Sequence, residues 1–228
     1  VPLHTDATQA VGKIPVDFQE LGVDALSFSA HKFHGPTNIG GLLLKHSTIL
    51  QPLFYGGFQQ LGMRPGSEPV ALAVGMQAAL NAWKQTSAKD EKSLEEMRNL
   101  FESLLQERLP WISITCQPQP RLPHISNIAF PGLNRQTLMI ALDMAGVACS
   151  TGSACASGST DPSPVLQAMG LPEALVEGAL RFSFGRQNQA AETRQAADLV
   201  ATTASHLQST NPPEKTASEP PQQPAKQL

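Results

Sequence analysis

The stretch that decides the fold reads Ser27-Phe28-Ser29-Ala30-His31-Lys32, and it ends a short apolar run at residues 23–29. This run predicts a strand, and a second apolar run at residues 40–44 predicts another. Between them, Gly35-Pro36 predicts a loop, because this dipeptide interrupts regular structure. Open α/β sheets bind their ligands at the carboxyl ends of strands. The sequence therefore predicts an α/β sheet with a site at this edge.

The polar residues at this edge suit cofactor chemistry when they are taken together. Lys32 can form an imine once desolvation and nearby positive charge lower its pKa. Ser29 and His31 alternate along the chain and could both hold an anion such as a phosphate. Residues 1–3 read as the end of another strand, so Asp6 could pair with a pyridine nitrogen and Gln9 with a ring hydroxyl. Taken singly, a surface lysine and a helix-capping aspartate explain these positions better. However, the combination of Asp6 with Ser29, His31, Lys32 and Gly35-Pro36 at this spacing is a specific pattern.

A second motif surrounds a cysteine. Residues 150–159 read Ser-Thr-Gly-Ser-Ala-Cys-Ala-Ser-Gly-Ser, a composition that predicts a mobile loop. A cysteine in such a loop, Cys155, is available as a nucleophile once it is a thiolate. The composition of the loop is equally compatible with a surface thiol that has no function. Cys116 and Cys149 stand in apolar segments and are predicted to be buried and structural.

An arginine motif follows, Arg181-Phe182-Ser183-Phe184-Gly185-Arg186. An arginine near a strand can bind a carboxylate through two parallel hydrogen bonds, which suits Arg181. We interpret Arg186 as a helix-start or surface arginine. His31 and His34 make only a weak zinc pattern, so no metal site is predicted.

These motifs resemble the class V pyridoxal-phosphate enzymes of fold type I, and they are most similar to cysteine desulfurases of the NifS/IscS type. The group I signature of these desulfurases, Ser-(Ser/Thr)-Gly-Ser-Ala-Cys, matches residues 150–155. The segment Gly62-Met63-Arg64-Pro65-Gly66-Ser67 resembles the loop that reaches the phosphate in the neighbouring subunit. Ser67 replaces the usual threonine there and keeps its hydroxyl group.

The resemblance implies a role for each motif residue. The cofactor would be pyridoxal 5'-phosphate, with its ring and phosphate bound by Asp6, Gln9, Ser29, His31, Lys32 and Ser67. The catalytic residues would be Cys155, Lys32 and His31. The substrate L-cysteine would be bound by Arg181 and, near its reacting end, by Asn127.

The activity implied by the resemblance is conversion of L-cysteine to L-alanine, with a persulfide left on Cys155. An iron–sulfur scaffold or other acceptor protein would take the sulfur, and the full-length enzyme would be a homodimer. Two alternatives stay open. One is a selenocysteine lyase or class V aminotransferase, although Cys155 argues against the aminotransferase. The other is a non-catalytic half-domain acting as an interaction protein, against which the intact Lys32 and Arg181 argue.

The composition excludes several other classes of protein. The net charge of −3 and pI near 6.1 give no basic footprint for nucleic acid. No apolar run reaches the length of a membrane-spanning helix. Three cysteines, an odd number, argue against a disulfide framework and for a reducing compartment, which predicts a cytoplasmic protein.

The chain divides into three predicted parts. Residues 1–85 are expected to be the carboxyl-terminal part of the cofactor-binding large domain, and residues 86–208 an α+β small domain with the cysteine loop. Residues 209–228 are rich in proline and glutamine and are expected to be a disordered tail. Because the resemblance covers only the carboxyl-terminal half of the family, we expect a fragment that binds pyridoxal phosphate poorly alone.

Periodicity gives the remaining elements. Helices are predicted at residues 70–83, 93–109, 136–145, 164–169, 173–179 and 190–207, and strands at residues 111–116, 125–130, 147–149 and 180–184.

Overall fold

The computed structural model describes residues 1–152 and 162–210. These residues form two compact units, one made of residues 1–99, 116–125 and 184–188, the other of residues 100–115, 126–183 and those from 189 onward. Each unit is described by itself below. The predicted boundary after residue 85 stays a prediction, and the predictions for Cys155 and the tail beyond residue 210 lie outside the described residues.

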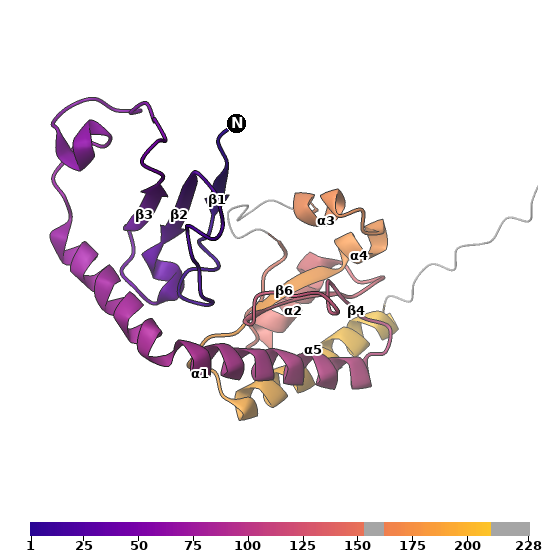
Figure 1. Ribbon diagram of the computed structural model, residues 1–228. Coiled ribbons are helices and arrows are strands. Elements are labelled where there is room, and N and C mark those ends of the chain that lie inside the picture. The colour runs from indigo at the N-terminus through magenta and orange to yellow at the C-terminus, as the bar shows by residue number, and fades with distance from the viewer. Residues whose placement is uncertain (153–161, 211–228) are drawn as a thin grey trace, which may run out of the picture. The chain divides into compact units, whose positions relative to one another are not determined.

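The first unit contains a three-stranded sheet in the order β1 (His4–Asp6), β2 (Ala25–Ser29), β3 (Gly40–Leu44) (Figure 1). β1 runs parallel to β2, with Asp6 opposite Ser27, whereas β3 runs antiparallel to β2. Ala7, Val23 and Leu26, the last of which belongs to β2, form a buried hydrophobic cluster in this unit. Parallel pairing brings the carboxyl ends of β1 and β2 to the same edge, as the α/β prediction requires.

A short 3-10 helix, η1 (Ala30–Phe33), follows β2 directly and carries the lysine of the motif. It is held against the turn after β1 by a close contact. Gly12 has φ of +74°, and a Cβ at this position would lie 2.2 Å from the Phe33 Cβ. Only glycine fits both the backbone conformation and the space, so Gly12 fixes how closely the turn approaches η1.

One long helix, α1 (Val70–Arg108), replaces the two helices predicted at residues 70–83 and 93–109. It has 39 residues, and a shorter 3-10 helix, η2 (Gln59–Gly62), precedes it. The stretch between the two predicted helices has no apolar periodicity, which is why the sequence suggested a break. It also has no glycine or proline, so nothing interrupts the backbone hydrogen bonds.

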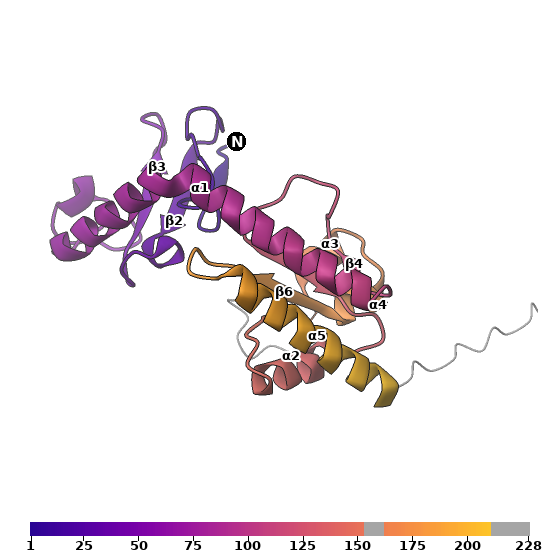
Figure 2. The same ribbon diagram turned by 90° about the horizontal axis from the view of Figure 1, so that it is seen from below.

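The second unit holds another three-stranded sheet, in the order β4 (Ser113–Ile114), β5 (Ile125–Ala129), β6 (Ala179–Ser183). Its helices are α2 (Arg135–Met144), α3 (Pro164–Ala168), α4 (Glu173–Glu177) and α5 (Ala190–Thr210). α5 packs against α2, as Figure 2 shows. The Asn134 side chain accepts hydrogen bonds from the first turn of α2 and so fixes where that helix begins.

The core of the second unit is mainly apolar and includes a buried polar pair, Glu102 and Ser126. Phe101 of α1 and Phe182 of β6 place their ring centroids 5.0 Å apart. Beside them, the Ser126 hydroxyl donates a 2.6 Å hydrogen bond to the buried Glu102 carboxylate. A buried carboxylate is tolerated because it accepts such bonds.

Two cysteine predictions and one strand prediction are corrected. Residues 147–149 do not form a strand, because Gly146 at φ +86° ends α2 and the Val147 amide still bonds to the Leu142 carbonyl. Cys116 is exposed and has φ of +56°, beyond the end of β4, so its prediction as buried is wrong. Cys149 is half-buried, and burial raises the pKa of its thiol to about 11.

Candidate active site

The first set of candidate residues lies at the carboxyl edge of β1 and β2. Past the end of β1, the Ala7 amide donates a 2.8 Å hydrogen bond to the Ser27 carbonyl, which extends the parallel pairing by one step. Asp6 therefore ends its strand level with Ser27, two residues before Ser29 and the start of η1. The structure brings these predicted residues to one edge because two strands far apart in sequence pair in parallel.

Asp6 is held in its ionised form by the turn that follows it. The Thr8 amide donates a 2.9 Å hydrogen bond to Asp6 Oδ1. Hydrogen bonds from the Thr8 side chain and then its backbone lower the pKa of Asp6, with a smaller contribution from His4. A carboxylate that stays ionised at neutral pH can pair with a protonated ring nitrogen. The hydrogen bonding of Thr8 to Asp6 was not predicted from the sequence, although an aspartate two residues before a threonine is typical of such a turn.

Ser29 and His31 are joined directly, with 2.8 Å between Ser29 Oγ and His31 Nδ1. Ser29 is the residue before η1, and Lys32 lies one residue further in that helix, half-buried. The bond fixes the orientation of the imidazole and leaves Nε2 on its other side. A hydroxyl, an imidazole and an ammonium group within four consecutive residues form a donor set suited to an anionic ligand.

Gln9 and Ser67 are both exposed. Gln9 lies in the turn after β1, close in sequence to Asp6. Ser67 follows a segment shaped by its own contacts, since Arg64 donates to the Pro65 carbonyl at 2.7 Å and the Gly66 amide to the Gln59 side chain at 3.3 Å. Their predicted contacts with a cofactor stay predictions.

The second set lies in the second unit, around β6. Arg181 and Ser150 exchange two backbone hydrogen bonds, of 3.0 and 2.7 Å, so the beginning of the cysteine motif is fixed beside the arginine strand. Within the described residues, Arg181 Nε is buried and has no hydrogen-bond partner. A buried donor without a hydrogen-bond partner raises the free energy of the folded protein. A substrate carboxylate that accepted a hydrogen bond from Arg181 Nε would remove this cost, which favours its binding.

Asn127, on β5 next to β6, is oriented by β4's end. The Thr115 hydroxyl donates a 2.7 Å hydrogen bond to Asn127 Oδ1, and the Thr115 amide bonds to the Asn127 carbonyl. The amide nitrogen of the Asn127 side chain is not used in these bonds. The role of Thr115 could not be predicted from the sequence, because its contact with Asn127 depends on how the two strands pair.

The predicted residues thus fall into two groups. Those for the cofactor belong to the first unit, whereas Arg181 and Asn127 belong to the second, and Cys155 lies outside the described residues. Among residues 1–152 and 162–210 there is no group of histidine, cysteine, aspartate and glutamate that could hold a metal ion. In the same residues, no helix is long and apolar enough to cross a membrane.

Comparison with known proteins finds relatives that match most of this chain. The chain is 37% identical over 209 residues to a cysteine desulfurase of Gluconacetobacter diazotrophicus, covering 92% of this chain and 52% of the relative. It is also 37% identical to the cysteine desulfurase IscS of Dictyoglomus turgidum, covering 92% of this chain and 53% of the relative. The chain therefore spans about half the length of the curated relatives it matches.

Solved structures show the same likeness. A NifS-like protein superposes with a TM-score of 0.79 at 30% identity, over 90% of this chain and 53% of the other. A structure described as SspA in complex with cysteine gives a TM-score of 0.63 at 32% identity, over 81% of this chain and 50% of the other. The fold is therefore that of fold type I, as predicted.

The family match covers both groups of candidate residues. The sequence model described as Aminotransferase class-V matches residues 1–195, which include the edge of β1 and β2, the cysteine motif and the arginine strand. With that match over most of its length, this chain belongs to the class-V aminotransferase family.

Proposed function

We propose that the protein is a pyridoxal-phosphate-dependent cysteine desulfurase, in which Cys155 accepts the sulfur of L-cysteine. The observation that carries the proposal is the backbone bridge between Ser150 and Arg181. It joins the start of the desulfurase signature to an arginine whose buried Nε has no partner among the described residues. The likeness to proteins named cysteine desulfurase, at 37% identity, supports it.

The residues at the edge of β1 and β2 fit the cofactor of this family, pyridoxal phosphate. The Asp6 carboxylate, kept ionised by Thr8, would pair with the ring nitrogen, and Gln9 would bond to the ring oxygen. Ser29 and His31, with Ser67 of a second subunit, would hold the phosphate. When bound, the cofactor supplies an electron sink for breaking bonds at the substrate α- and β-carbons.

Lys32 and His31 would handle the protons of the reaction. Lys32 carries the amine that binds the cofactor and, once released, can take a proton from the substrate and return one. His31 Nδ1 faces Ser29 at 2.8 Å, which leaves Nε2 to hold or give a proton. Ser29 thereby acts as a positioning residue for the imidazole.

Arg181 would bind the α-carboxylate of L-cysteine, with Asn127 nearby on the neighbouring strand. The Cys155 thiolate then attacks the substrate sulfur. An S–S bond forms, the substrate C–S bond breaks, and its electron pair goes to the carbon, which takes up a proton. The products are a Cys155 persulfide and L-alanine, so no outside oxidant is needed.

Transfer of this sulfur to an acceptor protein, such as an iron–sulfur scaffold, is part of the proposal. So are a homodimer and a cytoplasmic location. A homodimer is supported by the exposed apolar side chains before η2, which are Ile49, Leu53, Phe54, Tyr55 and Phe58. The absence of a disulfide-framework cysteine pattern supports a reducing compartment.

The test is mass spectrometry of the holoenzyme during turnover with L-cysteine. We expect the peptide with Cys155 to gain the mass of one sulfur atom, and Cys155→Ser to lose this gain while keeping cofactor absorbance. An unmodified Cys155 during alanine release would refute the proposal. Alanine formed from selenocysteine but not from L-cysteine would instead identify a selenocysteine lyase.

A further inference from the structure

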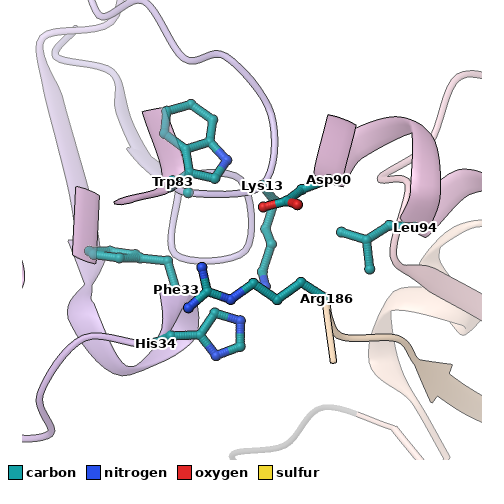
Figure 3. A pocket seen from close by; sticks show the side chains of 8 residues that line it. Lys13, Phe33, His34, Trp83, Asp90, Leu94 and Arg186 are labelled. Atoms are coloured by element: carbon teal, nitrogen blue, oxygen red, sulfur yellow. The ribbon is translucent and has the colours of Figure 1, made fainter. Parts of the chain in front are cut away.

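A small pocket in the first unit shares no residue with the predicted cofactor set. Its charged lining comes from segments far apart in the sequence: Lys13 after β1, His34 after η1, Asp90 in α1 and Arg186 after β6. Phe33, Trp83 and Leu94 supply apolar walls. Figure 3 shows the Lys13, His34 and Arg186 side chains converging, with the Asp90 carboxylate on the other side of the pocket in this view.

The charges in this pocket do not balance. Lys13 and Arg186 are cations, His34 can become one, and Asp90 is the single carboxylate of the lining. Asp90 already accepts a 2.6 Å hydrogen bond from the Thr86 hydroxyl. Within the described part of the chain, no ion pair of 4.0 Å or less joins Lys13 or Arg186 to a carboxylate. The cations thus face one another with little compensation.

The same imbalance is visible in the titration of these groups. Burial lowers the pKa of Lys13, and the charge of Arg186 lowers it further, against a smaller opposing effect of Asp90. Burial, Lys13 and Arg186 lower the pKa of His34. A bound anion would relieve both effects, because it favours the charged form of each base.

Trp83 adds a fourth donor. Its Nε1 is buried and has no hydrogen-bond partner among the described residues. Trp83, Asp90 and Leu94 stand seven and eleven residues apart on α1, a spacing that places them on one helix face. In Figure 3 the nitrogen lies on the side of the indole that faces Lys13 and Asp90. Buried indole N–H groups normally find an acceptor, and this pocket contains little else but donors.

We propose that this pocket binds a phosphate group, either inorganic phosphate or the phosphate of a small monoester. Lys13, His34, Arg186 and the Trp83 indole would donate to its oxygens. Asp90 would accept a hydrogen bond from a P–O–H group. This explains how a carboxylate can be part of an anion site. Sulfate has no such hydrogen at neutral pH and would meet repulsion from Asp90, so the pocket prefers phosphate. This inference does not depend on the proposed desulfurase activity.

Tryptophan fluorescence provides a direct test on the full chain. The sequence has two tryptophans, so Trp111→Phe leaves Trp83 as the single reporter. In this background, titration with inorganic phosphate at constant ionic strength should give a saturable signal. Arg186→Gln and Lys13→Gln should each weaken binding about tenfold, the loss expected for one hydrogen bond to a charged group. Lys84→Gln, an equal charge change on an exposed residue of α1, should leave it unchanged.

Further arms separate this site from others. Ser29→Ala with His31→Gln removes the predicted cofactor-phosphate ligands and should leave the Trp83 signal intact. Asp90→Asn should improve sulfate binding and reduce the preference for phosphate. Lys13→Arg keeps the charge and should bind phosphate with close to wild-type affinity, whereas Lys13→Gln, checked by circular dichroism to be folded, should bind about tenfold more weakly. Repeating the titration with glycerol phosphate tells a monoester site from one that admits only inorganic phosphate.

The proposal is overturned if the signal does not saturate, if chloride reproduces it, or if the Lys84 variant weakens binding as much as the pocket variants. Loss of the signal in the Ser29/His31 variant would also overturn it, since the phosphate would then be bound at the cofactor edge.

Discussion

Ser150 and Arg181 are bridged through their backbones alone, by N–H to carbonyl bonds of 3.0 and 2.7 Å in opposite directions. The bridge therefore does not depend on either side chain. It fixes the beginning of the cysteine motif to β6, so that the predicted sulfur acceptor, five residues further along, and the predicted carboxylate ligand share one main-chain anchor.

The first prediction concerns this bridge. Ser150→Pro removes the amide that donates to Arg181, whereas Ser150→Ala keeps both backbone bonds. We expect the proline variant to lose about 1 kcal/mol or more of local stability and most of its persulfide formation, measured by mass spectrometry. The alanine variant should stay close to wild type. Equal loss in both would mean that the hydroxyl, which contacts the Gly152 carbonyl at 3.4 Å, is what matters.

The second prediction concerns the Arg181 side chain. Arg181→Lys keeps a positive charge but loses the planar pair of donors, including the buried Nε. The KM for L-cysteine should rise about tenfold or more, with a smaller change in kcat, in steady-state assays of alanine release. Arg194→Lys, at an exposed position of α5, is the matched control. An unchanged KM in the Arg181 variant would remove this residue from the substrate site.

The third prediction concerns the protonation of Asp6. Hydrogen bonds from Thr8 lower the pKa of Asp6 in the folded protein, so the carboxylate contributes stability above its unfolded pKa and loses it as pH falls through the lower, folded value. Thr8→Val removes the side-chain bond, and the folded pKa should move back up toward an ordinary aspartate. Carbon-detected NMR titration of Asp6 measures this directly. Asp6→Asn should abolish tight cofactor binding, whereas Asp17→Asn should not.

The fourth prediction concerns Gly12. A Cβ there would meet Phe33 at 2.2 Å and would sit on a backbone with φ of +74°. Gly12→Ala should cost several kcal/mol in urea unfolding, because both the clash and the backbone strain must be relieved, and should displace η1. Gly22→Ala isolates the second effect, since Gly22 has φ of +67° but nothing within 4 Å, and should cost only about 1 kcal/mol. Similar losses in both variants would show that the contact with Phe33 is soft.

The fifth prediction concerns His34 and the phosphate pocket. The lowered pKa of His34 means that a bound anion must draw a proton onto the ring, so affinity should rise as pH falls through that pKa. Lys13, Arg186 and Asp90 line the same pocket as this ring, and an imidazole is the side chain whose ordinary pKa lies closest to neutrality. Sulfate binding to the Asp90→Asn variant is the probe, because phosphate itself titrates near neutral pH and sulfate is repelled by Asp90 in the wild type. His34→Asn, which tolerates the φ of +68°, should flatten the pH dependence of binding followed by Trp83 fluorescence.

Local patterns placed most strands within a few residues of their observed positions, because each depends on neighbouring residues. However, β1 is His4–Asp6 rather than the strand end predicted at residues 1–3, and β4 keeps only Ser113–Ile114 of the strand predicted at residues 111–116. Residues 40–44 were predicted as a strand and form β3 with the same bounds. Contacts between residues far apart in the chain could not be predicted from local patterns. Cys149 was assigned to a strand because its neighbours are apolar, but only Ser150 finds a pairing partner, 31 residues away in β6. Arg186 was interpreted as a surface or helix-start residue and is indeed exposed, but nothing local in the sequence relates it to Lys13 and Trp83, which line the same pocket.

The continuity of α1 limits how this protein can change in length. Its polar middle, residues 84–92, is the kind of surface stretch in which insertions are usually tolerated. Here one added residue would turn every later side chain by about 100° around the helix axis. Leu94, Met97 and Phe101 would turn away from the buried face of the helix. If the residue were inserted before Asp90, Asp90 would no longer lie on the same helix face as Trp83. A segment of unremarkable composition is thereby held to a fixed number of residues, and relatives that keep this helix unbroken should accept substitutions there but not gaps.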